Sequence, residues 1–179
     1  MTVVLLQGNM IFQHTLYTTI VRPHLEYASP AWSPNRKGDT KAREAIQRRA
    51  TKIVPNIKNL AYDERLKSLG LTTLEERRNR GDLIQYFKCV KGLNIVNWYH
   101  PNNITTSVNS EGPASSIRDH THRLVRQFTR GFTPRDNFLI NRIVPLWNSL
   151  PREIVNADSV NSFKNKYDKL KLSPLIDIN

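Results

Sequence analysis

The chain has 179 residues with a single cysteine, and its 27 lysine and arginine residues against 15 acidic residues give a formal net charge of +12. One cysteine excludes an intrachain disulfide and a cysteine-based zinc site, and it favours a reducing compartment, the nucleus or the cytoplasm. We expect no signal peptide and no membrane-spanning segment. The charge favours a polyanionic partner, nucleic acid first and an anionic membrane surface second, over a basic protein without such a partner.

Periodicity and end signals predict a mainly α fold with a long loop and at most one small β-hairpin. The first predicted helix covers residues 11–27, and Pro23 should kink or interrupt it. A second helix begins at Asp39 or Thr40 and is stopped by Pro55.

The third predicted helix covers residues 61–70, and Gly70 should end it in a left-handed conformation. The fourth, over residues 74–91, should begin with a capping box of Thr73 and Glu76, and a glycine follows it.

The second half of the chain begins with a stretch rich in Asn, Ser, Thr, Pro and Gly, which predicts a loop or linker. Residues 123–132 could form a short strand pair, and Pro145 should interrupt a helix over residues 136–151. A final helix over 158–170 has Asp158 or Ser159 as its cap. The expected regions are 1–98 (helical), 99–122 (loop or linker), 123–170 (helical extension) and 171–179 (frayed tail).

Residues typical of a self-contained enzyme are missing from the sequence. There is no glycine-rich phosphate loop and no carboxylate pair suited to two magnesium ions, since Asp63–Glu64 and Glu75–Glu76 sit at helix starts, where acids favour the dipole. The segment Asp119–His122 lacks a clear third and fourth metal ligand. Cys89 is interpreted as a packing residue.

Trp32 and Trp147 each lie beside a proline-bounded turn and are interpreted as core anchors, not as surfaces for base stacking. Without an RNA-recognition or helix-turn-helix pattern, contact with a phosphate backbone is favoured over base readout.

The second predicted helix carries a basic stripe at the edge of its apolar face, formed by Lys41, Arg48 and Lys52. The predicted apolar face consists of Ala42, Ala45, Ile46, Ala50 and Ile53. A stripe of like charges destabilises a helix by itself, which favours a polyanionic partner. By period Arg49 points into the middle of the apolar face, where it must snorkel, pair with a buried acid or reach a ligand.

The fourth predicted helix has the same two-sided character. Its apolar face consists of Leu83, Ile84, Tyr86, Phe87 and Val90, and its other side of Arg77, Arg78, Gly81 and Lys88. Pairs of Arg80 with Glu76 and of Arg78 with Asp82 would explain its charges structurally. Arg77 and Lys88 are further candidates for nucleic-acid contact.

Three stretches resemble, in one order, the region after the catalytic palm in non-LTR retrotransposon reverse transcriptases of the jockey and CR1 type. They are LYTTIVRPHLEYASPAWSP (Leu16–Pro34) with the following AIQRRATKIV, then Asn59–Leu93, and then Phe138–Leu170. They cover most of the chain. Ala61 departs from the pattern, because relatives usually carry Ser or Thr there, so the third helix should begin less firmly, by roughly 1 kcal/mol.

The resemblance implies a thumb-like helical bundle and C-terminal extension that holds the RNA or DNA backbone of a template-primer. Onto QRRATK it places Arg48, Arg49 and Lys52 as backbone contacts. With the stripe and the fourth helix, the candidate nucleic-acid-binding residues are Lys41, Arg48, Arg49, Lys52, Arg77 and Lys88.

The palm's paired aspartates and the family's endonuclease have no counterpart here. We therefore expect no catalytic residue, no metal site and no cofactor in this chain, with magnesium implied only for the parent polymerase (an RNA-directed DNA polymerase), whose palm and fingers are the other expected partners. Two alternatives stay open at this point. One is a domesticated basic scaffold that binds acidic protein surfaces, and the other is a non-functional remnant of a mobile element.

Overall fold

The structure is a computed structural model that describes residues 12–34, 36–94, 123–124, 126 and 133–172. The described part is mainly α, as the sequence predicts, and contains no strand. Residues 12–16 are helical and continue into the first labelled element. The elements are the π-helix η1 (Tyr17–Val21), α2 (Arg22–Glu26), α3 (Lys37–Ile53), the 3-10 helix η2 (Pro55–Ile57), α4 (Tyr62–Ser68), α5 (Leu74–Val90), α6 (Thr133–Asp136), α7 (Leu139–Asn148), α8 (Arg152–Val155) and α9 (Val160–Leu172).

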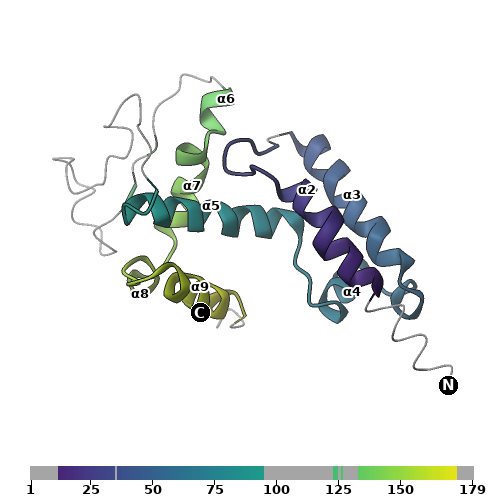
Figure 1. Ribbon diagram of the computed structural model, residues 1–179. Coiled ribbons are helices and arrows are strands. Elements are labelled where there is room, and N and C mark those ends of the chain that lie inside the picture. The colour runs from purple at the N-terminus through teal and green to yellow at the C-terminus, as the bar shows by residue number, and fades with distance from the viewer. Residues whose placement is uncertain (1–11, 35, 95–122, 125, 127–132, 173–179) are drawn as a thin grey trace, which may run out of the picture. The chain divides into compact units, whose positions relative to one another are not determined.

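The chain forms two compact units, which divide between Asn79 and Arg80 inside α5 (Figure 1). The predicted division into four regions stays a prediction, because the predicted linker and most of the predicted hairpin lie outside the described residues. Leu124, which is described, exchanges both backbone hydrogen bonds with the side-chain amide of Asn148, each at 2.9 Å.

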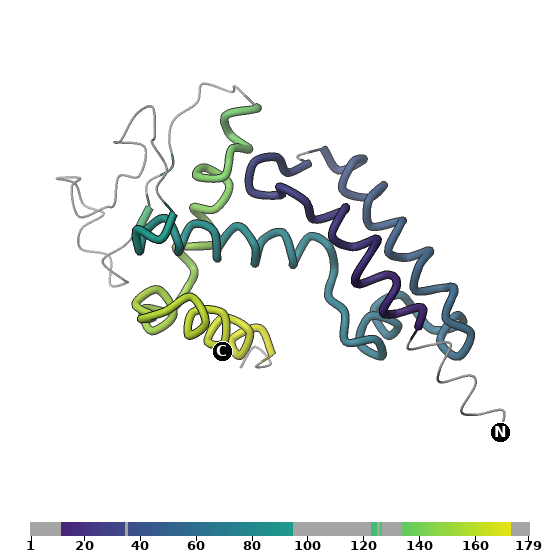
Figure 2. Tube along the Cα trace, in the orientation of Figure 1, coloured from purple at the N-terminus to yellow at the C-terminus, as the bar shows by residue number. Residues whose placement is uncertain are grey.

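The first unit is built on the pairing of the N-terminal helix with α3, which run side by side in Figure 2. Tyr17 on η1 reaches Gln47 on α3 through a buried side-chain hydrogen bond of 2.6 Å. The apolar core of this unit is a small cluster formed by Tyr17, Tyr62, Leu66 and Leu71. This cluster is small, so the polar contacts described below carry much of the packing.

Several helix ends follow their local sequence signals, whereas α3 begins at Lys37, before the start predicted at Asp39 or Thr40. Gly70 has a φ of 62°, and the bonds from its own N–H to the Lys67 carbonyl and from the Leu71 N–H to the Leu66 carbonyl close α4 in a Schellman motif. Thr73 and Glu76 form the predicted capping box, in which each side chain bonds the other residue's N–H at 3.2 Å. Both predictions are confirmed.

The cap of the last helix is also confirmed, and it is the second of the two predicted residues. The Ser159 hydroxyl accepts a hydrogen bond from the Ser162 N–H at 3.1 Å. A small side-chain oxygen in this position satisfies one of the free N–H groups of the first turn.

Neither of the two helix prolines ends its helix. Helical structure continues through Pro23 to Glu26, and the irregularity is taken up by the π turn η1 just before it. Pro145 lies inside α7 without ending it. The interruption predicted at Pro145 is therefore wrong, since the apolar face of α7 is buried on both sides of the proline and holds the helix in place.

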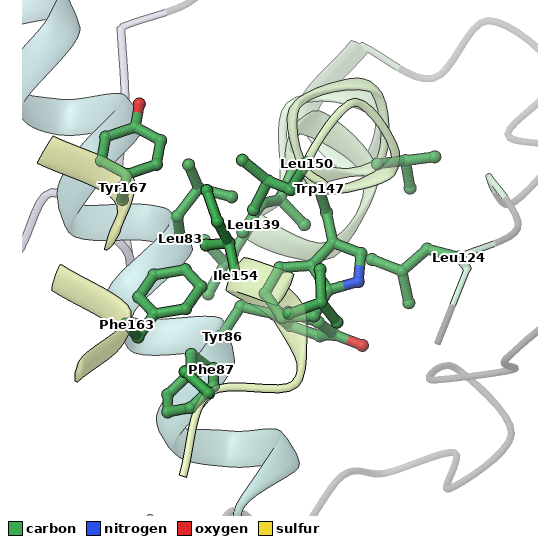
Figure 3. Packing of buried hydrophobic residues seen from close by; sticks show 14 residues of the cluster. Leu83, Tyr86, Phe87, Leu124, Leu139, Trp147, Leu150, Ile154, Phe163 and Tyr167 are labelled. Atoms are coloured by element: carbon green, nitrogen blue, oxygen red, sulfur yellow. The ribbon is translucent and has the colours of Figure 1, made fainter. Parts of the chain in front are cut away.

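The second unit has the larger core, which gathers the aromatic side chains of α5, α7 and α9 (Figure 3). The ring of Trp147 is fully buried and meets Tyr86 edge-on, with ring centroids 4.7 Å apart. Phe87 stacks on Phe163 at 4.5 Å. The prediction that Trp147 is a core anchor is confirmed.

Two arginine–aspartate pairs tie α5 to the other helices of this unit. Arg80 binds Asp168 on α9 through two hydrogen bonds of 2.7 Å, and Arg142 on α7 binds Asp82 at 2.8 and 2.9 Å. The pairing of Arg80 with Glu76 predicted within the helix is wrong, because bidentate partners on α9 offer better geometry than a neighbour one turn away.

Arg78 likewise has a different environment from the one predicted. Its expected partner Asp82 is engaged by Arg142, and Arg78 is only 5% exposed. Cys89 is half-buried, and burial raises the pKa of its thiol, as suits a packing residue. No helix in the described ranges combines the length and apolar character that crossing a lipid bilayer requires.

Candidate nucleic-acid interface

The orientation of α3 is set by polar side chains, not by its apolar residues. Gln47 is completely buried and Thr51 is 2% exposed, whereas Ile46 and Ile53 are 40% and 64% exposed. Ala42 is exposed as well. The predicted apolar face is therefore wrong for Ala42, Ile46 and Ile53, since the helix turns its Gln47–Thr51 side into the first unit, and of the predicted face Ala50 packs against the apolar cluster.

Gln47 is the centre of the buried network that causes this orientation. Its Oε1 accepts a hydrogen bond from the Tyr17 hydroxyl at 2.6 Å, and its Nε2 donates to the Tyr62 hydroxyl and to the Thr72 carbonyl, both at 3.0 Å. A buried amide must find such partners to offset its desolvation. Gln47 finds them on three other segments of the unit.

Glu44 belongs to the same network and is thereby turned inward. One of its carboxylate oxygens accepts a short hydrogen bond from the Tyr62 hydroxyl, and the other accepts one from the Leu74 N–H at 3.1 Å, at the start of α5. Burial and the bond to Glu44 raise the pKa of Tyr62, and burial raises that of Tyr17 to about 12. The Glu44 carboxylate, which lies beside the basic stripe in the sequence, therefore bonds Tyr62 and Leu74 and not the cations of the stripe.

The outer side of α3 then presents a stripe of four exposed cations, hereafter the α3 stripe. It consists of Lys37, Lys41, Arg48 and Lys52. At 100° per residue these positions fall within about 60° of one another, and the stripe is about 22 Å long. Within the described part of the chain, none of the four forms an ion pair.

A groove of about 500 Å³ lies beside the stripe, lined by Thr40, Lys41, Glu44, Arg48, Tyr62, Asp63, Thr73 and Glu75. The guanidinium of Arg48 lies 4.2 Å from the centre of the Tyr62 ring. This contact with the Tyr62 ring restricts the position of the Arg48 side chain, so its charge is held at a defined point of the surface.

Arg49 is exposed, so the prediction that it points into a buried face is wrong. The error follows from the predicted apolar face itself: Arg49 lies within about 60° of Ile46 and Ile53 around the helix, and that side of α3 faces outward. Arg49 is about 60° from Lys52 around the helix and borders the α3 stripe.

Of the other two candidates, Arg77 is engaged in an ion pair and Lys88 belongs to the second unit. Arg77 forms a bidentate pair with Glu26, which also accepts a hydrogen bond from Arg22 at 2.9 Å. Burial lowers the pKa of Arg22, with the charge of Arg77 as the second cause. Lys88 is half-buried and belongs to the second unit.

Sequence reasoning missed two features of this region. Lys37 extends the stripe by one turn, and its spacing of four residues from Lys41 was the available signal. Trp32 is 41% exposed and lies against the Arg43 guanidinium, so its interpretation as a core anchor is wrong. No local pattern marks a contact between residues this far apart in the chain.

Among the described residues, no group of three or more His, Cys, Asp or Glu side chains is placed to hold a metal ion. The segment Asp119–His122 lies outside those residues. The resemblance to reverse transcriptases described above rests on the sequence motifs alone. Comparisons with protein-family models, with curated proteins and with solved structures found no match to this chain.

Proposed function

We propose that the first unit binds the sugar-phosphate backbone of a nucleic-acid duplex through the α3 stripe. In this proposal the chain corresponds to the thumb and C-terminal region of a non-LTR retrotransposon reverse transcriptase and has no polymerase active site of its own. The template-primer of such an enzyme, an RNA–DNA hybrid, is the expected ligand.

The observation that carries the proposal is the row of unpaired, exposed cations on a rigid helix. Like charges at helical spacing repel one another, so holding Lys41, Arg48 and Lys52 together costs stability unless a polyanion neutralises them. One strand of a duplex carries a phosphate about every 3.4 Å of axis, so a stripe about 22 Å long spans roughly six of them. Arg49 is the adjacent contact.

Arg77 and Lys88 are not part of the proposal. Arg77 uses the Nε–Nη2 edge of its guanidinium on the two carboxylate oxygens of Glu26, which is the geometry of a structural ion pair. Lys88 lies in the other unit and is half-buried.

The test is the salt dependence of binding to a hybrid primer-template, measured with the full chain by fluorescence anisotropy. Each phosphate contact contributes about 0.9 to the slope of log K against log salt concentration. We expect the double variant Arg48→Gln/Lys52→Gln to reduce the magnitude of the slope by about 2.

The control is a double variant with the same loss of charge, Lys58→Gln/Lys67→Gln, at two exposed lysines outside the stripe. It should change the slope by less than about half a unit, because long-range attraction alone does not release counterions. Equal slopes for the two double variants would contradict the assignment of the stripe. A chain with no affinity for duplexes that binds an acidic protein instead would favour the scaffold alternative.

A further inference from the structure

The first unit contains two arginines, Arg43 and Arg78, for which the described residues supply no ion pair. Arg43 on α3 is half-buried and Arg78 on α5 is 5% exposed. Each keeps a buried Nη1 for which the described part of the chain supplies no hydrogen-bond acceptor. A guanidinium N–H buried in this way costs free energy, because it has given up water without gaining a partner.

The start of α5 lies against α3 beside Arg43, because the Leu74 N–H donates to the carboxylate of the neighbouring Glu44 at 3.1 Å, and Arg78 follows Leu74 by about one helical turn. Burial lowers the pKa of Arg43, and the positive charge of Arg78 lowers it further, with Asp39 acting in the opposite direction. Asp39 is exposed to solvent in the first turn of α3. Its screened charge therefore offsets only part of the repulsion between the two arginines.

A tryptophan holds one side of this pair in place. The Arg43 guanidinium lies 3.7 Å from the centre of the Trp32 ring, and the Trp32 indole N–H donates to the Tyr27 carbonyl at 3.0 Å. Ala28, in the same loop, has a φ of 50°, and its carbonyl accepts hydrogen bonds from the two N–H groups at Ala31 and Trp32. A non-glycine residue in the left-handed region is strained, and such strain is typical of segments that position a functional group.

We propose that Arg43 and Arg78, with Trp32 behind Arg43, form a binding site for one phosphate group. Two guanidinium forks with free N–H donors match the oxygens of a phosphate, whose charge would relieve their mutual repulsion. Trp32 stacked on one face of Arg43 leaves the edge of the fork for the anion. The site is separate from the α3 stripe, because Arg43 is about 200° around α3 from Lys41. The phosphate site does not depend on whether the proposed function is correct.

The test measures the melting temperature of the full chain with sodium phosphate and with sodium chloride at equal ionic strength and pH. At a phosphate concentration ten times the dissociation constant, we expect a rise of roughly 3–5 °C over chloride. The variants Arg43→Gln and Arg78→Gln should each abolish the difference, and Arg43→Lys should reduce it, because a lysine cannot form the fork. Arg43→Gln is at the more accessible position and keeps the test valid if Arg78→Gln does not fold.

Two further arms separate the sources of the phosphate and the two proposals. An oligonucleotide with a 5′-phosphate that stabilises the chain more than its 5′-hydroxyl form would identify a strand end as the ligand, whereas equal effects with a response to inorganic phosphate would identify the free anion. The stripe variant Arg48→Gln/Lys52→Gln should keep the full response to inorganic phosphate. An equal response to phosphate and chloride, or an unchanged phosphate response in Arg43→Gln, would overturn the site.

Discussion

Replacing Gln47 with leucine tests why α3 turns its basic side outward. In the variant, the buried Tyr17 hydroxyl loses its partner at 2.6 Å and the part-buried Thr72 carbonyl loses its partner at 3.0 Å, while Tyr62 keeps its bond to Glu44. Each buried polar group without a partner costs about 1–3 kcal/mol. Leucine has a similar volume and gains some apolar burial, so we expect a loss of about 2–4 kcal/mol in the free energy of unfolding.

The matched control is the neighbouring substitution Ile46→Ala. The apolar pattern of the sequence makes Ile46 a core residue, whose truncation would cost about 2–5 kcal/mol. In the structure Ile46 is 40% exposed, so we expect roughly 1 kcal/mol. Urea denaturation followed by circular dichroism would compare the two variants with the parent chain. A larger loss for Ile46→Ala than for Gln47→Leu would refute the polar-network account of the α3 orientation.

Three further changes have expected outcomes in the same denaturation assay. Ala61→Ser should raise the free energy of unfolding by about 0.5–1 kcal/mol, because Ala61 is the N-cap of α4 and has no side-chain oxygen. An unchanged free energy of unfolding would mean that this helix start needs no cap. Glu26→Gln removes the carboxylate that two arginines share and should cost about 1–2 kcal/mol, against less than about 0.5 for the exposed Glu75→Gln. The hydrogen bond from Arg80 lowers the pKa of Asp168, so this pair stabilises above about pH 4 and loses its effect as the pH falls through the lowered value. Asp168→Asn should therefore cost about 0.5–1 kcal/mol at pH 7, a loss that shrinks toward zero near pH 2; a loss independent of pH would contradict the ion pair.

Features encoded within one or two helical turns were predictable from the sequence. The capping box at Thr73, the cap at Ser159 and the left-handed Gly70 each depend on residues within a few positions, and all three are where the sequence places them. The burial of Leu83 and Phe87 also follows the period of α5. These signals suffice for the helical class and for most helix ends.

Features that depend on distant residues were not predictable from the sequence. Hydrophobic periodicity treats Gln47 as an outward residue, yet its three partners on other segments make it the best-buried position of α3. The same reorientation moved Arg49 to the surface.

The α5 arginines show the same limitation. Arg80 has an acid at i−4, but Asp168, 88 positions away, provides the bidentate pair. Pattern rules score only neighbours, so they assign the local partner.

Lysine acetylation with and without a hybrid primer-template tests most directly the claim that the α3 stripe contacts the backbone. A bound duplex should shield Lys41 and Lys52 from the reagent, and mass spectrometry of the digested chain measures the modified fraction at each site. We expect at least about a threefold protection at these two lysines, with Lys58 and Lys67 unprotected, because contact with phosphates blocks only the amines it covers. Protection that is equal at all four lysines, or absent from the stripe while the duplex is bound, would contradict it.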